Sequence, residues 1–480
     1  MMRADQPQEM VKRFRYRYVS LVFCLMAMAS CRMGKNYQRP SVPLPQQFDQ
    51  GAPARDTNSI ADINWRNYFS DPVLRQLIDS GISRNYDLQY ALRNISIAHA
   101  EVKRESWLWY PQLSTGLSLT YNRYSDNGLT GINNGALTNN TLDYQAYATM
   151  NWEIDVWGKI SRQREAGMAN YLQSFEAAKA VQTQLVADIS HGYFNLLMLD
   201  QQLLETNKTL LLTENFVKLT RLLFDAGEVS YLAIQQAEAQ RAQTAVLVPL
   251  IQQNISIQEN ALQLLTGSLP GSIHREVMLT DVHFSDDIST GLPVALLNRR
   301  PDVRANELAL VSANAQVGIS QANMYPALNL TAGTGFESLK ASNWFNIPGS
   351  LFGLAGATLI QPVLQGRQFR TQLEIAKQQR EQAVIHFRQS VLTAAIEVTN
   401  ALVEVRQLKD QELIARQRSD TLSAAVGNAQ LLFKNDQANY LEVITAQQSA
   451  LDALLSLASI ERQELDARVE LYRSLGGGWK

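Results

Sequence analysis

Two stretches of this sequence are versions of one another. Residues 84–113 read RNYDLQYALRNISIAHAEVKRESWLWYPQL, and residues 299–328 read RRPDVRANELALVSANAQVGISQANMYPAL. Aligned without a gap, both begin with Arg, carry Asp three residues later and end in Tyr-Pro-x-Leu. Self-similarity over so long a period indicates that the chain is one structural unit written twice. The matched pairs are Arg84–Arg299, Asp87–Asp302, Ala98–Ala313, Ala100–Ala315, Val102–Val317, Tyr110–Tyr325, Pro111–Pro326 and Leu113–Leu328.

The match continues toward the end of each copy. Leu222-Leu223-Phe224 and Tyr231-Leu232 correspond to Leu431-Leu432-Phe433 and Tyr440-Leu441, and Gly267 corresponds to Gly476. Between these blocks, Gly158-Lys159 falls opposite Gly366-Arg367. We therefore predict a first repeat at 73–269 and a second at 299–480, joined by an equatorial linker at 270–298 that is interrupted by proline and glycine.

Each repeat is predicted to begin with a helix, at about 73–108 and about 301–324, which Tyr-Pro ends. Two strands should follow in each copy, at 113–124 and 142–153 and again at 327–338 and 350–361. The first of them alternates, with Leu113, Leu117, Leu119 and Tyr121 on one face and polar residues on the other. Strands of about ten residues with this alternation are typical of a transmembrane barrel.

A membrane helix is an alternative for 341–366, because that stretch carries no charge. Pro348, Pro362 and the three glycines between them interrupt it, so a strand is favoured.

Very long helices are predicted after the strands. Proline is absent between Pro111 and Pro249 and again after Pro362, and apolar residues recur every seven positions within about 158–224. This spacing indicates a coiled-coil seam, and such a helix would extend about 100 Å. A partner of equal length is expected at about 367–433. A short polar turn and a second helix complete each copy. The seam residues are Leu196, Leu203, Leu210, Val217 and Phe224.

The N-terminus reads as an export signal over 1–30, with basic residues from Lys12 to Arg17 before a short apolar segment. Met10 is an alternative start. The signal ends at Cys31, which resembles the lipidated cysteine of bacterial lipoproteins and would begin an extended segment at 31–72. An ordinary cleaved signal, with Cys31 as a small buried residue, is the alternative. Cys24 would leave with the signal, so the mature chain could form no internal disulfide.

Four strands cannot close a barrel, and an open sheet edge in lipid leaves backbone groups unsatisfied. Several chains must therefore share one barrel, which the long helices would extend. The expected fold is a mixed α/β membrane protein built as an oligomeric tube.

The chain resembles the outer-membrane factor family of tripartite efflux systems, in its lipoprotein branch of OprM-, NodT- and CusC-like channels. The resemblance covers nearly the whole mature chain. It implies a trimeric 12-stranded outer-membrane β-barrel, with four strands per chain, continuous with a long periplasmic α-helical barrel. It also implies a homotrimer that docks to a periplasmic membrane-fusion adaptor and an inner-membrane pump of the proton-driven RND type. The motifs that carry it are Tyr37-Gln38-Arg39-Pro40, Trp65 with Phe69 and Asp71-Pro72, Trp152 to Lys159, Arg299-Arg300-Pro301-Asp302 with Glu307, Ile360-Gln361-Pro362-Val363 and Leu475 to Trp479.

The same resemblance places function at the two helix-hairpin turns. In the family these tips close the channel and meet the adaptor. The candidate periplasmic gate is Leu441, Glu442 and Thr445, and three copies of Glu442 around one axis would attract cations. The alternative is that Glu442 is a solvated surface charge and that both turns are ordinary connections. The candidate adaptor-docking residues are Phe224, Gly227, Tyr231, Leu232, Phe433 and Tyr440.

Other function classes find little support in the sequence. The 43 basic and 45 acidic side chains nearly balance, and no basic run suggests nucleic acid. The five histidines show no metal-ligand spacing, and no catalytic motif occurs. We expect no enzyme and no cofactor beyond the lipid on Cys31. A channel for protein secretion and a coiled-coil scaffold lipoprotein remain alternatives to an efflux duct for drugs or other small toxic compounds.

Overall fold

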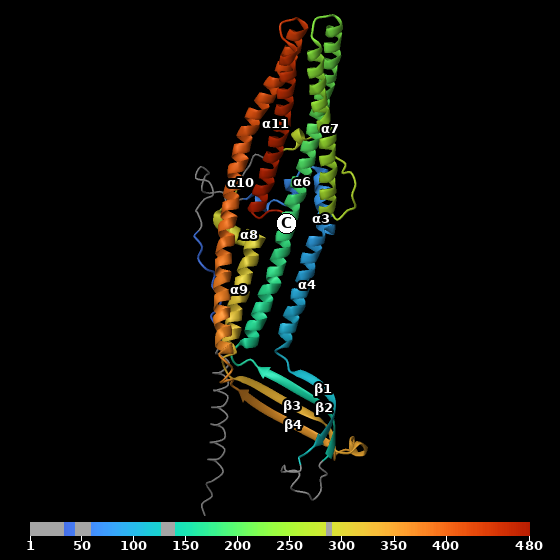
Figure 1. Ribbon diagram of the computed structural model, residues 1–480. Helices are drawn as coiled ribbons and strands as arrows, with labels where there is room; N and C mark the ends of the chain where they lie inside the picture. Colours follow the sequence, from blue (N-terminus) through green and yellow to red (C-terminus); the bar gives the residue numbers. More distant parts are fainter. Residues whose placement is uncertain (1–32, 44–58, 126–139, 285–289) are drawn as a thin grey trace, which may run out of the picture. The chain divides into compact units, whose positions relative to one another are not determined.

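The computed structural model describes residues 33–43, 59–125, 140–284 and 290–480 (Figure 1). Its described residues form two compact units, and each unit draws on both repeats. The sheet unit comprises those within 1–40, 96–172 and 307–385, and the hairpin unit those within 41–95, 173–306 and 386–480. Cys31 lies outside the described residues.

The elements of the first repeat follow the predicted order. They are α2 (Trp65–Tyr68), α3 (Pro72–Arg84), α4 (Tyr86–Trp107), β1 (Gln112–Arg123), β2 (Asn140–Ile154), α6 (Lys159–Asp225) and α7 (Tyr231–Leu265), with the short turn η1 (Ile60–Asp62) before them.

The linker and the second repeat continue this order with the short turns η2 (Leu279–Asp281) and η3 (Pro293–Ala295). They are followed by α8 (Leu296–Arg299), α9 (Pro301–Ala322), β3 (Ala327–Ser338), η4 (Ala341–Asn343), β4 (Leu351–Ile360), α10 (Gln368–Lys434) and α11 (Tyr440–Ser474). The long helices α6 and α10 each contain 67 residues, and α7 and α11 each contain 35. The order α4, β1, β2, α6, α7 thus recurs as α9, β3, β4, α10, α11.

One prediction was wrong at the start of the first repeat. We expected a single helix over 73–108, whereas α3 and α4 are separate helices that meet at Asn85. Asn85 has an extended backbone (ψ 130°), and its Oδ1 accepts a hydrogen bond from Leu88 N at 2.9 Å. Asn competes for backbone donors in this way at helix starts, so it ends one helix and caps the next.

The sheet unit holds one four-stranded antiparallel sheet in the order β1-β2-β3-β4. The two repeats join where β2 pairs with β3, from Tyr144 opposite Ser338 to Ile154 opposite Leu328. The stretch 341–366 contains β4, which confirms a strand there rather than a membrane helix. The apolar side chains predicted to share one face of β1 are all exposed, as a lipid-facing surface requires. They are Leu113, Leu117, Leu119 and Tyr121.

The N-terminal segment 33–40 is held against the helices of the sheet unit by polar contacts. Met33 N donates to Trp157 O at 3.0 Å, and the buried Arg162 donates to Met33 O and Gly34 O at 3.1 and 3.0 Å. Gly34 has φ +83°, and a Cβ there would lie 2.8 Å from Gly318 Cα. Only glycine permits so close an approach of two backbones.

The same segment is fixed farther along by Glu307 of α9. Arg39 binds both carboxylate oxygens of Glu307, at 2.6 and 2.8 Å, and Tyr37 Oη donates to Oε1 at 3.1 Å. Bidentate charge-assisted contacts of this kind fix the direction of a chain as well as its position. Residues 33–39 are therefore fixed against the sheet unit at both ends, by Trp157 and Arg162 and by Glu307.

The hairpin unit repeats one junction in both copies. Asn85 Nδ2 donates to Leu265 O at 3.0 Å, at the end of α7, and Arg300 Nη1 donates to Ser474 O at 3.1 Å, at the end of α11. Gly267 and Gly476 follow these helices with φ of +63° and +95°. In each copy the end of the second hairpin helix, α7 or α11, is thus bonded to the residue that precedes α4 or α9.

This junction yields a test of stability. At Gly267 an added Cβ would lie 2.6 Å from Arg84 O, and its φ is positive. We expect Gly267→Ala to destabilise the fold by about 2 kcal/mol or more, through steric overlap and the left-handed backbone. Gly271→Ala is the matched control, since its added Cβ would lie 4.0 Å from the nearest atom, Leu269 O, and its φ is ordinary. Thermal unfolding in detergent, followed by circular dichroism, measures both, and equal midpoints for the two variants would contradict the steric explanation.

Candidate functional site: the two helix-hairpin turns

The first turn connects α6 to α7 through residues 226–230. Glu228 N donates to Leu223 O and Gly227 N donates to Phe224 O, both at 2.9 Å. This pattern closes a helix C-terminus around a left-handed residue. Gly227 supplies that residue with φ +81°.

The second turn repeats this geometry with different side chains. Gln437 N donates to Leu432 O at 2.9 Å, and Asp436 takes the left-handed position with φ +53°. Asn439 then caps α11, since its Oδ1 accepts from Leu441 N at 2.9 Å and from Glu442 N at 3.1 Å. Ser230 stands at the same place before α7 but makes no side-chain cap. The start of α11 is therefore more firmly fixed than the start of α7.

The two hairpins pack against each other through one apolar cluster, which we call the turn cluster. Phe216 of α6 and Phe433 of α10 place their rings 5.4 Å apart, between the second helices of both hairpins. Figure 1 shows the two turns at the same end of the hairpin unit. Aromatic pairs at this distance favour one relative arrangement of the helices that carry them. The turn cluster consists of Phe216, Val217, Ala237, Phe433, Val443 and Ile444.

The three candidate gate residues all lie on the exposed part of the first turns of α11. Leu441 is 54% exposed, and Glu442 and Thr445 are also exposed. Thr445 follows Leu441 by one helical turn, so these side chains share a face. Glu442 contacts Asn439, whose Nδ2 lies 3.5 Å from its Oε1. The buried Val443 and Ile444 anchor the same turn in the turn cluster.

The candidate docking residues fall into two groups. Phe224, Gly227, Tyr231 and Leu232 are exposed, and the rings of Phe224 and Tyr231 lie 5.9 Å apart. Phe433 is only 6% exposed and belongs to the turn cluster, against which Tyr440 also packs. The surface available at the tips is thus formed mainly by the first turn, while Phe433 joins the hairpins.

Sequence reasoning missed Asn439 and the turn cluster. An Asn before a helix start is a recognisable cap signal, and it could have been read from Asn439-Tyr440-Leu441. The seam spacing includes Val217 but not Phe216. A seven-residue repeat identifies only one row of side chains on a helix, and Phe216 lies in the neighbouring row that contacts the other hairpin.

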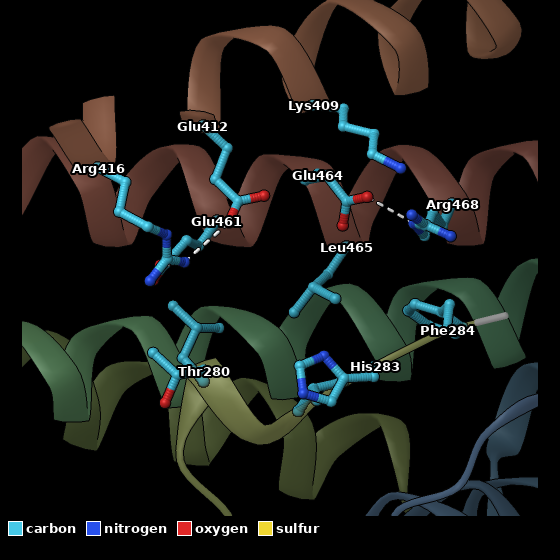
Figure 2. Close-up of a pocket in the computed structure, with 12 residues that line it drawn as sticks. Thr280, His283, Phe284, Lys409, Glu412, Arg416, Glu461, Glu464, Leu465 and Arg468 are labelled. Atoms are coloured by element: carbon cyan, nitrogen blue, oxygen red, sulfur yellow. Dashed lines mark hydrogen bonds and ion pairs between the residues drawn. The ribbon is translucent and has the colours of Figure 1, made fainter. Parts of the chain in front are cut away.

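A second feature of the hairpin unit is a charged pocket of about 380 Å³ between α10, α11 and residues 279–284 (Figure 2). Arg416 of α10 pairs with Glu412 of its own helix at 2.8 Å and with Glu461 of α11 at 2.7 Å. Glu464 pairs with Arg468 at 2.5 Å. Burial raises the pKa of Glu461, against the opposing charge of Arg416. Because both signs of charge are present and paired, the pocket joins two helices rather than selecting an ion.

Over the described ranges, no three or more His, Cys, Asp and Glu side chains are grouped so that they could hold a metal ion.

This combination defines a class of protein. A duplicated chain with four antiparallel strands and two very long helical hairpins is the subunit of an outer-membrane channel, and the predicted trimeric channel fold is confirmed. The chain belongs to the outer membrane efflux protein family, whose model matches residues 77–268 and 292–477. It is therefore an outer-membrane channel component of a Gram-negative efflux system, extending into the periplasm, and its family forms ducts rather than enzymes.

Individual relatives cover almost the whole chain. The cation efflux system protein CusC of Escherichia coli O6:H1 is 28% identical over 470 residues, covering 96% of this chain and 98% of the relative. The toluene efflux pump outer membrane protein TtgF of Pseudomonas putida is 28% identical over 478 residues, covering 96% and 97%. A crystal structure of CusC superposes with a TM-score of 0.83 at 27% identity, covering 93% of this chain and 100% of that chain.

The charged pocket predicts a pH dependence. A carboxyl whose pKa is higher in the folded chain stabilises the fold most at low pH, and that contribution is lost as the pH rises through the folded-state pKa. We therefore expect Glu461→Gln, which cannot ionise, to flatten the fall in stability between about pH 4 and pH 8. Unfolding midpoints across this range measure the effect.

Glu412→Gln is the matched control, because Glu412 pairs with the same Arg416. It should retain most of the slope of the wild type, because burial is the largest cause of the raised pKa of Glu461 and the charge of Glu412 is a lesser one. Identical pH profiles for the Glu461→Gln variant and the wild type would show that burial of Glu461 has no energetic consequence.

Proposed function

We propose that this chain is the passive exit duct of a tripartite efflux pump, closed at the first turns of α11 and opened by its partners. The observation that carries the proposal is the exposed row of Leu441, Glu442 and Thr445 beside the anchored Val443 and Ile444. The start of α11 is firmly packed and exposes an apolar and an acidic side chain. Three copies of this helix start are suited to form a ring around a threefold axis. Three Glu442 carboxylates in such a ring would repel one another and attract cations.

The partners follow from the same proposal. The duct would be a homotrimer that meets a periplasmic membrane-fusion adaptor and a proton-driven inner-membrane pump. The exposed Phe224, Tyr231 and Leu232 of the first turn offer the adaptor an aromatic and apolar surface. Aromatic side chains of this kind are enriched where protein surfaces associate. The duct itself would perform no catalysis, so the exported compound would be chosen by the pump.

Efflux is favoured over protein secretion by the relatives. CusC is named for cation efflux and TtgF for toluene efflux, and both align over nearly their full lengths. We therefore propose small toxic compounds, drugs or metal ions as the exported class. A scaffold lipoprotein would have no use for four paired strands at matched places in both repeats.

The gate is tested by single-channel conductance in planar bilayers. We expect small or rare openings for the wild type and larger, steadier openings for Leu441→Ala/Glu442→Ala, because the double variant removes bulk and charge from the proposed constriction. Leu232→Ala is the matched control, since Leu232 occupies the place of Leu441 in the first hairpin and is similarly exposed. It should conduct like the wild type. Wide and equal conductance for all three would leave the duct intact and reject the gate.

Lipidation of Cys31 is a further part of the proposal. The contacts of Met33 and Gly34 with Trp157 and Arg162 hold the chain two residues beyond Cys31 at the junction of β2 and α6. A lipid at Cys31 would then lie at the base of the strands, where a membrane surface is expected.

Metabolic labelling with a palmitate analogue tests this assignment. We expect the mature protein to carry the label, Cys31→Ser to lose it and Cys24→Ser to keep it. A wild-type chain that matures without label would support the alternative of an ordinary cleaved signal.

A further inference from the structure

The two strand-to-helix junctions of the sheet unit begin with the same contact. Trp152 and Gln361 each follow the residue that pairs with the first residue of β1 or β3. Each then bonds to the turn that ends the preceding helix. Trp152 Nε1 donates to Trp109 O at 3.1 Å, and Gln361 Nε2 donates to Met324 O at 3.0 Å. The two junctions therefore differ only beyond these residues.

The first junction satisfies its own charges. Glu153 accepts a hydrogen bond from Lys159 Nζ at 2.9 Å. Asp155 accepts from Ile160 N at 3.0 Å and from Ser161 N at 2.9 Å, at the start of α6. A carboxylate at this place offsets the partial positive charge of the helix N-terminus. The first junction therefore supplies its own anion.

The second junction reverses this pattern. Leu364 stands where Asp155 does, and no Asp or Glu occurs from residue 338 to residue 373. Arg367 and Arg370 lie at the start of α10 instead, and both are exposed. Among the described residues, neither guanidinium donates a hydrogen bond or forms an ion pair. Two cations beside the N-terminus of a long helix are thus left without an anion.

Apolar side chains next to these cations are also uncovered. Val363 is 83% exposed, and Leu364, at 95%, is the most exposed large apolar side chain in the described ranges. Both line one open pocket of about 640 Å³ together with Arg367 and Arg370. We call these four residues the junction surface. It combines apolar and cationic side chains within a single hollow.

The junction surface lies at one border of the membrane. β4 is a strand of the outer-membrane sheet, and α10 begins the helical part of a chain that extends into the periplasm. The residues between them therefore meet the leaflet that borders the periplasm. Lipid headgroups there carry phosphate, and cations beside apolar side chains are suited to such a surface.

We propose that the junction surface binds an anionic phospholipid of this leaflet. Arg367 and Arg370 hold the headgroup phosphate, and Val363 and Leu364 contact the acyl chains. A soluble phosphate would leave the apolar pair in water. The first strand of another copy would not neutralise the cations, since residues 106–122 contain neither Asp nor Glu. The proposal rests on the outer-membrane location of the sheet and not on the gate.

Native mass spectrometry of the full-length trimer tests this site. The protein in detergent is titrated with phosphatidylglycerol and, separately, with phosphatidylcholine of the same acyl chains. We expect phosphatidylglycerol to bind several-fold more tightly, with one tight site in each copy. Arg367→Gln/Arg370→Gln should weaken its binding by about tenfold or more and leave phosphatidylcholine unchanged, because each cation near an anionic surface contributes about fivefold.

Lys377→Gln/Arg388→Gln is the matched control, because it removes two exposed cations from α10 farther from the strands. This variant should bind phosphatidylglycerol like the wild type. Arg367→Gly/Arg370→Gln repeats the test in case the first variant does not fold, since glycine readily adopts the φ of +64° at residue 367.

The outcomes distinguish a lipid from other occupants. Val363→Ser/Leu364→Ser should weaken binding of both lipids several-fold, and no loss would overturn the acyl-chain contact. Displacement of phosphatidylglycerol by equimolar glycerol 3-phosphate would indicate a site for soluble phosphate and overturn the proposal. Loss of the trimer in the arginine variants, with lipid binding to each copy unchanged, would indicate a contact between copies and also overturn it. Equal phosphatidylglycerol affinity in the wild type and both arginine variants would reject the site and leave the proposed duct standing.

Discussion

Backbone hydrogen bonds at the edges of a membrane sheet must be made, and four strands cannot make them alone. This constraint determines much of the remaining architecture. A sheet that closes only with other copies needs two outer edges, and a duplicated chain supplies them because each repeat contributes one antiparallel hairpin. The pairing of β2 with β3 joins these hairpins within the chain. The long helices α6 and α10 begin directly after β2 and β4, so strand positions also fix where the helices start.

The two repeats are not equivalent where strand meets helix. In the first, Asp155 accepts hydrogen bonds from Ile160 N and Ser161 N, and Trp157 packs on the second repeat. In the second, Leu364 and Gly366 stand at these places. The left-handed residue of the first copy is Gly158, with φ +75°, whereas in the second copy Gly366 and the adjacent Arg367 are both left-handed, with φ +55° and +64°. A side chain in this conformation is strained by about 1–2 kcal/mol, so the second junction is the less stable of the two.

Much of the fold could be predicted because its signals are long and periodic. The strand 327–338 was predicted with its observed bounds, and the helices over 159–225 and 368–434 were placed within one residue. The break at Asn85 was missed because a single capping side chain outweighed an uninterrupted helical pattern. The role of Arg162 was also missed, since it depends on contacts with residues 33–36 that lie far away in sequence. The candidate site was placed at the two turns only through a family resemblance, and periodicity alone did not distinguish buried Phe433 from exposed Phe224.

The two turns share a backbone but present opposite surfaces, and this difference gives the second turn its proposed role. Tyr231-Leu232-Ala233 begins α7 and Tyr440-Leu441-Glu442 begins α11. Ala233 is fully buried, whereas Glu442 at the corresponding place is exposed. A carboxylate could not be buried there without a partner, so α11 must present this face to solvent. Val443 and Ile444 meanwhile hold the same helical turn in the turn cluster with Phe216. Glu442 must stay in water, while the helical turn that carries it must stay packed. The surroundings of Glu442 can therefore change only if the hairpin moves as a whole. A gate at this position would therefore open by displacement of the hairpin, with the turn cluster as the contact that resists it.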